Sequence, residues 1–431
     1  MKTIAGKTTS QDGHLTAFGG NGHKGPVAPA LAGAKGARWT RAGWIFLFIF
    51  AITIMFSISM AQISAGLATL CWAARWRAEQ KTPSFSWLGW PIAAFVMLSL
   101  LAALLSMDMR ESLKDSKDLF HFFVFVVGFD YLRRDIYKIP ILLRIIAASG
   151  LGIALVGFVQ VMQRGITIED RIRGFNDMYM TYAGLLALAF VAGLAVATFD
   201  FRKWKDAWLA PGLVIILCAI VLSLTRSALI GSVAGAFVIL ALRKPVALIV
   251  IPILAALALA LAPADVKSRF TSMFDVNADS NSERVYVWGA GLKIARDHIL
   301  FGVGQNCFPR VYPEYMDPNV KEPSISHLHN NMLEIAVERG IPTLLAWLAI
   351  WIIAYWRMGA AMRSSSGRSP ESTLGLVAGL GGVTAFLSIG FFEYNFGDAE
   401  PKMLCLLILA IGMAAAAQTA VVKPAKPASD N

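Results

Sequence analysis

The sequence predicts an all-α polytopic membrane protein with about 12 transmembrane helices and one large loop outside the cytoplasm that contains amphipathic helices. Of its 431 residues, 56% are hydrophobic and only 16% are charged, whereas about a quarter of a soluble domain is charged. The mean hydropathy is +0.59. The apolar runs are continuous rather than alternating, which indicates membrane-spanning helices and excludes a barrel of strands.

Each expected span is a run of mainly apolar residues. The candidates are 44–60, 61–75, 88–105, 119–132, 139–162, 178–199, 208–224, 226–242, 245–262, 341–357, 373–392 and 401–417. Several of them are shorter than the roughly 20 residues that a straight span needs.

The segment from Trp44 to Trp72 is almost unbroken and fits either one long helix or two short ones. The positive-inside rule separates these options, because Lys and Arg gather on the cytoplasmic side. One long helix would put the six bases of the N-terminal segment, which are Lys2, Lys7, Lys24, Lys35, Arg38 and Arg41, on the wrong side. We therefore predict a hinge near Ser57–Ser59 and both termini in the cytoplasm.

The net charge of +11 has the same explanation, since cytoplasmic loops of membrane proteins are rich in bases. No basic amphipathic or RNA-binding pattern is present, so no nucleic-acid partner is expected. The loops on the opposite side are balanced or acidic. The loop 393–400, for example, contains Glu393, Asp398 and Glu400 and no base.

The predicted domains follow from this topology. Residues 1–40 form a disordered cytoplasmic tail, 41–262 the first nine spans, 263–332 the large outer loop, 333–417 the last three spans and 418–431 a cytoplasmic tail. Within the loop, apolar residues recur at helical spacing in SERVYVWGAGLKIARDH, with Ser282 as the expected N-cap. GVGQN (302–306) is turn-rich, and a last amphipathic helix, about 330–339, ends at Gly340 before Pro342.

Four arginines lie on the outer side at the edge of the bilayer. Arg226 stands between two apolar runs, where it either reaches the lipid head groups or binds a ligand. Arg284, in the first turn of the loop helix, either pairs with Glu283 or lies low on the membrane surface and binds an anion. Arg171 and Arg173 are weaker candidates, and an interfacial anchor is slightly favoured over an anion contact for both.

His327-Leu328-His329-Asn330-Asn331 precedes the last amphipathic helix. Ser326 or Asn330 is the expected cap of that helix. A metal site is not predicted, because the nearest carboxylates, Glu334 and Glu338, do not stand at zinc-binding spacing. A helix N-terminus disfavours a charged imidazolium and favours the neutral form, which suits a general base.

Taken together, these side chains indicate group transfer from a lipid-linked diphosphate to an alcohol. The guanidinium fork of Arg matches phosphate oxygens, and a neutral histidine can deprotonate a hydroxyl. No acidic pair of the DxD type stands on this side, so the sequence predicts no metal and no cofactor, with arginines neutralising the leaving diphosphate.

The chain resembles the O-antigen ligase family, which also includes O-antigen polymerases and bacterial O-linked oligosaccharyltransferases. The resemblance covers mainly 223–345. It comprises the TRS around Arg226, the ERVYVWGAGLKIARDHILFGVGQNCF segment after Ser282, and the pattern His329-Asn330, nine residues, Gly340. The family often continues with G-x-x-G, and Thr343 takes the place of the second glycine here.

The resemblance implies a role for each of these residues. His329 would be the base, and Arg226 and Arg284 would hold the diphosphate of an undecaprenyl-diphosphate-linked glycan. Asn330, Arg171 and Arg173 remain weaker candidates from the sequence itself. The acceptor would be a sugar hydroxyl of lipid A–core oligosaccharide. The enzyme would be metal-independent and inverting, would lie among the lipids of the bacterial inner membrane, and would act on the periplasmic side to complete lipopolysaccharide.

Two alternatives to the ligase remain open. An O-antigen polymerase would use two lipid-linked glycans and share most of the pattern. A transporter or flippase of an anionic lipid would use the arginines to line a path, but such proteins often contain repeats, and none is visible here. An O-linked oligosaccharyltransferase usually carries a further outer domain after the last spans, whereas only about 14 residues follow the final expected span here. The ligase is therefore expected first and the polymerase second.

Overall fold

The computed structural model describes residues 34–80, 86–165, 171–176, 178–243, 245–246, 249, 279–318, 320, 324–364 and 368–421, and every regular element in these ranges is a helix. The long helices of the first part are α1 (Ala34–Thr53), α2 (Ile58–Glu79), α3 (Gly89–Leu104), α5 (Phe122–Arg134), α6 (Ile139–Arg164), α7 (Tyr179–Phe199), α8 (Leu209–Leu222) and α9 (Arg226–Arg243). The later ones are α12 (Asp279–Asp297), α15 (Ile341–Arg363), α16 (Pro370–Gly390) and α17 (Ala399–Val421). Short elements are α4 (Met109–Asp115), α13 (Phe308–Tyr315), α14 (Asn331–Arg339), η1 (Ser116–His121), η2 (Ile136–Lys138) and η3 (Lys203–Asp206).

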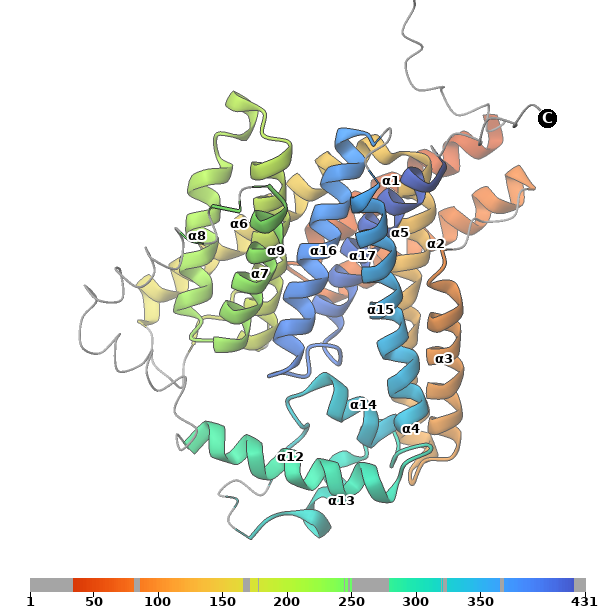
Figure 1. Ribbon diagram of the computed structural model, residues 1–431, viewed down its shortest axis with the longest axis vertical. Helices are drawn as coiled ribbons and strands as arrows, with labels where there is room; N and C mark the ends of the chain where they lie inside the picture. The colour runs from red at the N-terminus through yellow and green to blue at the C-terminus, as the bar shows by residue number, and fades with distance from the viewer. Residues whose placement is uncertain are drawn as a thin grey trace, which may run out of the picture.

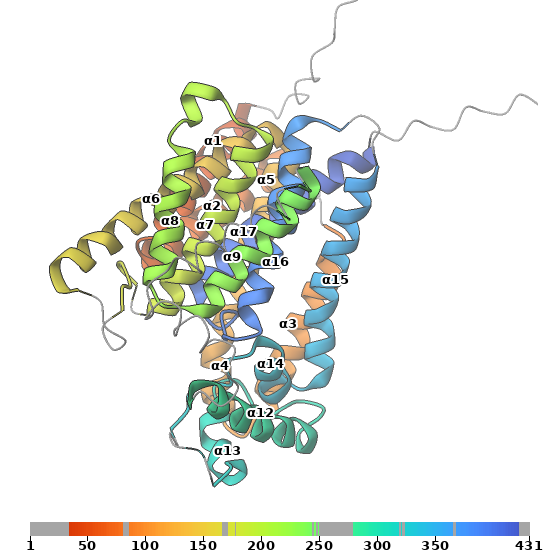
Figure 2. The same ribbon diagram turned by 60° about the vertical axis from the view of Figure 1, so that its left-hand side comes forward.

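The long helices other than α12 pack side by side as a bundle (Figure 1 and Figure 2). Seven of the described helical segments are long and apolar enough to cross a membrane: Ile136–Arg164, Tyr179–Phe199, Lys203–Leu222, Arg226–Arg243, Ile341–Arg363, Pro370–Gly390 and Ala399–Thr419. The window of α17 is 89% buried inside the protein, so α17 lies at the centre of the bundle and its neighbours shield it from lipid. The described part of the chain is therefore all-helical and has the apolar helices of a membrane protein.

The predicted number of 12 spans stays a prediction. All but one of the expected spans coincide with a described helix or, at 119–132, with the end of η1 and α5. The span 245–262 lies almost entirely outside the described residues. α5 has only 13 residues, which is too short for a straight crossing.

The predicted hinge between the first two spans is confirmed. α1 ends at Thr53 and α2 begins at Ile58, with extended Ser57 between them accepting a hydrogen bond from the backbone N–H of Met60. The expected tails are shorter than predicted. Residues 34–40 already belong to α1, and α17 continues through Val421, because helical hydrogen bonding extends beyond the apolar stretch that marks each span.

α12, α13 and α14 form a separate layer across one end of the bundle (Figure 1 and Figure 2). This layer has its own hydrophobic core, built from residues such as Ile294 of α12, Phe308 of α13 and Val337 of α14. The expectation that Ser282 caps α12 was wrong, because the helix begins three residues earlier, at Asp279. The amphipathic helices predicted within the outer loop are otherwise confirmed.

Candidate active site

The segment His327–Asn331 begins at this layer and is tied to the bundle by its two asparagines. Asn330 is the N-cap of α14: its Oδ1 accepts a hydrogen bond from the Leu333 N–H at 3.0 Å, and its Nδ2 donates to the Phe391 carbonyl at 3.1 Å. The expectation of an Asn330 cap is thus confirmed. Both ends of its amide are engaged by the protein itself, which indicates a positioning role.

Asn331 makes the second connection. Its Nδ2 donates to Asn395 Oδ1 at 2.7 Å, and its Oδ1 accepts from the Phe396 N–H at 3.0 Å. Asn395 in turn donates to the Phe386 carbonyl of α16. Asn330 and Asn331, called the asparagine anchors below, therefore hold the segment 327–331, called the histidine loop below, against the loop 391–398. The loop 391–398 joins α16 to α17.

His329 itself adopts a left-handed backbone conformation, with φ at 51°. This region is uncommon for a residue with a side chain and costs of order 1–3 kcal/mol where it persists. The asparagine anchors that follow it supply enough hydrogen bonds to hold this geometry. As a result the imidazole turns toward the 391–398 loop, and its side chain remains 29% exposed.

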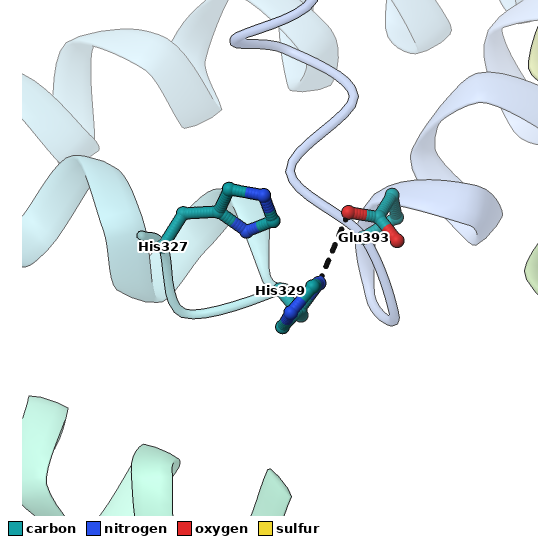
Figure 3. Close-up of side chains that lie close together, drawn as sticks. All are labelled: His327, His329 and Glu393. Atoms are coloured by element: carbon teal, nitrogen blue, oxygen red, sulfur yellow. Dashed lines mark hydrogen bonds and ion pairs between the residues drawn. The ribbon is translucent and has the colours of Figure 1, made fainter. Parts of the chain in front are cut away.

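The imidazole meets a buried carboxylate there. His329 Nδ1 lies 3.1 Å from Glu393 Oε1, and the Glu393 side chain is only 7% exposed (Figure 3). Burial opposes the ionisation of Glu393, but the hydrogen bond with His329, the electrostatic interactions with both histidines and the bond from the Tyr394 N–H outweigh it, so the Glu393 pKa is lower than usual. An ionised carboxylate only accepts hydrogen bonds. Nδ1 of His329 therefore carries the proton, and Nε2 presents the lone pair.

This pairing changes one expectation. The sequence pointed only to the positive end of α14, which disfavours an imidazolium. Glu393 adds a second influence, because its buried carboxylate accepts the hydrogen bond from Nδ1. The arrangement is the base-and-orienting-carboxylate pair that many enzymes use to activate a hydroxyl.

His327 lies beside His329, with ring centroids 4.2 Å apart and an interplanar angle of 74°. Burial and the neighbouring His329 lower the pKa of His327 to about 4, so this ring is neutral at ordinary pH. Its Nδ1 is buried and has no hydrogen-bond partner among the described residues. Figure 3 shows both imidazoles and the Glu393 carboxylate grouped around one point.

The two carboxylates of α14 face the interior instead. Glu334 accepts a hydrogen bond from the Leu328 N–H, and Glu338 accepts one from the Asn306 N–H at 2.7 Å. Burial raises the pKa of Glu334 well above its usual value and that of Glu338 to about 7. These hydrogen bonds hold the backbone at Leu328 and at Asn306 against α14.

Gly340 stands eleven positions after His329, at the point where α14 must end. α14 ends where the backbone of Leu300 and Phe301 passes, and Ile341 N–H donates to the Ile299 carbonyl at 2.8 Å. Gly340 has φ at 82°, and a Cβ there would meet the Leu300 carbonyl. The GVGQN turn also pairs with the end of α14, through Val303 N–H to the Val337 carbonyl at 2.9 Å. The helix length thus sets the distance between the histidine loop and this crossing.

Arg284 and Arg226 approach the same place from two other elements. Arg284 lies in α12 and is partly buried. Burial lowers its pKa, the negative charge of Glu393 raises it, and the positive charge of Arg226 lowers it further. Arg226 and Glu393 therefore both lie within electrostatic range of Arg284, although the three residues are far apart in the chain.

Arg226 is the first residue of α9. A cation at a helix N-terminus is unfavourable by about 0.3–1 kcal/mol, and the same terminus attracts anions. Two arginines near a helix N-terminus form a site suited to a phosphate-bearing ligand. This arrangement supports the anion-binding alternative for Arg226 and Arg284.

Arg171 and Arg173 lie near this group, with their anion-binding role still a prediction. The Arg171 guanidinium stacks 4.5 Å from the ring centre of Tyr179, and Tyr179 is also an electrostatic neighbour of Arg284. Arg173 is exposed, and its backbone N–H donates to Gln160 Oε1 at 3.3 Å. The cation–π contact of Arg171 is consistent with the anchor that the sequence slightly favoured.

Comparison with known families gives one match. Residues 211–348 match the family model described as O-antigen ligase. This segment, about a third of the chain, is similar to the O-antigen ligase family. A search of curated proteins found no match to the chain.

The O-antigen ligase match includes Arg226, Arg284 and His329, whereas Glu393 lies beyond it. Glu393 was the residue that sequence reasoning missed. Its only signal was a set of acidic residues without a base in an outer loop.

Proposed function

We propose that the protein is a glycosyltransferase that transfers O-antigen glycan from undecaprenyl diphosphate to a sugar hydroxyl of lipid A–core oligosaccharide, and so completes lipopolysaccharide. The observation that carries this proposal is the buried Glu393 carboxylate 3.1 Å from His329 Nδ1, with Arg226 and Arg284 in electrostatic range. Such a transfer needs a base that deprotonates the acceptor hydroxyl and cationic side chains that bind the diphosphate. Arg226 and Arg284, called the diphosphate clamp below, would be these cationic side chains.

The chemical step follows from these groups. The acceptor oxygen attacks the anomeric carbon of the donor sugar while its proton moves to His329 Nε2. The bond between that carbon and the diphosphate oxygen breaks, and undecaprenyl diphosphate leaves with the bonding electrons. Glu393 stabilises the imidazolium that forms. Attack opposite the leaving group inverts the anomeric configuration.

The leaving diphosphate gains negative charge as its bond breaks. Arg226 and Arg284 offer planar, permanently charged donors to its oxygens, so transfer proceeds without a metal. The N-terminus of α9 adds a further positive field at Arg226. The proposed reaction takes place at the periplasmic face of the bacterial inner membrane, with both chain termini in the cytoplasm.

An apolar groove beside the site supports a lipid-linked donor. It has a volume of about 380 Å³ and begins at Asn331 and Phe391, next to the anchors of the histidine loop. It continues along α15 past Trp347, Trp351 and Tyr355. These residues are four apart, and they cover about 12 Å of one helix face at 1.5 Å per residue. We assign this groove to the polyprenyl chain of the donor, whose diphosphate the two arginines hold at the end nearest Asn331 and Phe391.

Purified protein tests the proposal directly. It is incubated with lipid-linked glycan and either lipid A–core or a second lipid-linked glycan, and the extended product is identified by mass spectrometry. Extension of lipid A–core supports the ligase. Extension of the lipid-linked glycan alone would make the protein a polymerase, which shares the same base and clamp. Absence of either product, with a protein that remains folded, would contradict both.

A further inference from the structure

The two histidines and Glu393 form a cluster that the proposed transfer only partly uses. One ligand atom from each of His327, His329 and Glu393 lies within 4.8 Å of the others. His329 Nδ1 and Glu393 Oε1 are already 3.1 Å apart. Figure 3 shows the three side chains converging from two loops.

These separations fit a small metal ion after minor side-chain movement. Zinc binds imidazole nitrogen and carboxylate oxygen at about 2.0–2.2 Å, so ligand atoms on one tetrahedron are roughly 3.3–3.5 Å apart. The His329–Glu393 edge is close to this value. The remaining edges need shifts of at most about 1.5 Å, which rotation of the His327 ring and the Glu393 carboxylate can supply.

The donor set determines the class of metal. Two imidazoles and one carboxylate favour Zn²⁺ and similar transition metals, whereas Mg²⁺ and Ca²⁺ favour oxygen ligands. The fourth position faces the open side of His329, whose side chain is 29% exposed, and would be filled by water.

His327 provides an independent reason. Its Nδ1 is buried and finds no hydrogen-bond partner in the described part of the chain. Buried polar atoms are nearly always satisfied, and an unsatisfied one often marks an absent ion or water. The proposed transfer assigns no role to His327, so a ligand role would account for this atom.

We propose that His327, His329 and Glu393 bind one Zn²⁺ ion, and that the bound ion inhibits glycan transfer. The metal would replace the proton on His329 Nδ1. A neutral imidazole metallated at one nitrogen carries its proton on the other, so Nε2 becomes an N–H and can no longer accept the proton of the acceptor. Zinc bound at this site would thus inhibit glycan transfer, although the transfer itself needs no metal. The inhibitory part, though not the binding itself, rests on the proposed function.

Metal binding is tested on the full chain, purified without a histidine tag and stripped with a chelator. Equilibrium dialysis against Zn²⁺ measures stoichiometry and affinity, and Co²⁺ serves as a spectroscopic probe of tetrahedral nitrogen and oxygen ligation. We expect one ion per chain. His327→Ala should weaken binding at least about 10-fold, while His298→Ala, which removes the histidine at the end of α12, should leave binding unchanged.

Transfer assays then separate the two claims. Without metal, His327→Ala should be as active as the wild type, and Zn²⁺ should inhibit the wild type at concentrations at least about 10-fold lower than those that inhibit His327→Ala. Zinc binding that is unaffected by both His327→Ala and Glu393→Gln would overturn the site. Binding that depends on His327 but leaves transfer unaffected would keep the site and contradict the role of His329 as base. If the wild type binds zinc as proposed but catalyses no transfer at all, the proposed function fails while the metal site stands.

Discussion

His329 Nδ1 and Glu393 Oε1 are 3.1 Å apart although 64 residues of chain separate them. The contact joins the loop before α14 to the loop between α16 and α17. It aligns the imidazole, assigns its tautomer and places a buried negative charge behind it. The asparagine anchors and the left-handed backbone of His329 place the imidazole where it makes this contact.

Glu393→Gln tests the contact without removing its volume. The amide can still accept a hydrogen bond from Nδ1 but carries no charge, so the imidazolium that forms during transfer is less stable. We expect kcat to fall roughly 10-fold to 1000-fold and the acid limb of the pH–rate profile to move to lower pH, with unchanged insertion. Glu400→Gln, which alters another carboxylate near the same loop, should retain activity and profile. An unchanged profile in Glu393→Gln would mean that the carboxylate is merely structural.

Arg226→Lys and Arg284→Lys test the diphosphate clamp. Lys keeps the positive charge but loses the planar fork that binds two phosphate oxygens, so each variant should lose roughly 10-fold to 100-fold in kcat/KM. The matched controls lie in the same two helices: Arg243→Lys at the far end of α9 and Arg296→Lys in the last turn of α12. The clamp would be refuted if both site variants matched their controls.

Gly340→Ala tests the reason for the spacing between His329 and Gly340. Gly340 has φ at 82° and ψ at 166°, a region essentially restricted to glycine that costs other residues about 1–3 kcal/mol, and the new Cβ would also collide with the Leu300 carbonyl. The variant should have a clearly lower melting temperature and weaker transfer. Gly359→Ala in α15 is the control, because a Cβ there meets nothing within 4 Å, and it should be neutral or slightly stabilising. Equal stability of the two variants would refute the close approach.

Glu338 gives a pH dependence of stability. Its pKa is about 7 in the folded protein, because burial outweighs the opposing effects of Arg339 and the Asn306 N–H bond, whereas an unfolded Glu titrates near 4.3. The folded state therefore binds the proton more tightly, and this contribution to stability is lost as pH rises from about 4.3 to 7. Glu334 acts in the same direction and His327 in the opposite one.

Comparison of melting temperatures isolates the Glu338 contribution. Glu338→Gln keeps a neutral side chain at every pH, so its stability relative to the wild type should increase between about pH 5 and pH 8. The exposed Glu314→Gln on α13 serves as the control and should track the wild type. A constant difference between Glu338→Gln and the wild type across this range would show that Glu338 is not the titrating group.

Local features of the site were predictable from the sequence. The Asn330 cap, the length of α14 and its stop at Gly340 depend on residues within one or two turns of each other, and all three are present in the structure. The hinge at Ser57 followed from charge placement, which reflects how the chain inserts into a membrane.

The contacts between distant segments were not predictable. Glu393 was visible only as part of an acidic loop, because its neighbour His329 is reached through the packing of α14 against the 391–398 loop. The start of α12 was misplaced because Ser282 is a favourable cap by composition, yet the helix continues back to Asp279. The two arginines shared a predicted side of the membrane, but their approach to Glu393 depends on how α9 and α12 pack around the site.

The most direct test of the central claim is the rate of glycan transfer by purified His329→Ala in the presence of EDTA, measured beside the wild type on lipid-linked glycan and lipid A–core. The account predicts that the wild type remains active with the chelator and that His329→Ala loses transfer by roughly 10²-fold to 10⁴-fold while its melting temperature and membrane insertion are preserved. Near-normal transfer by His329→Ala, or a wild-type activity that EDTA abolishes and a divalent cation restores, would contradict it.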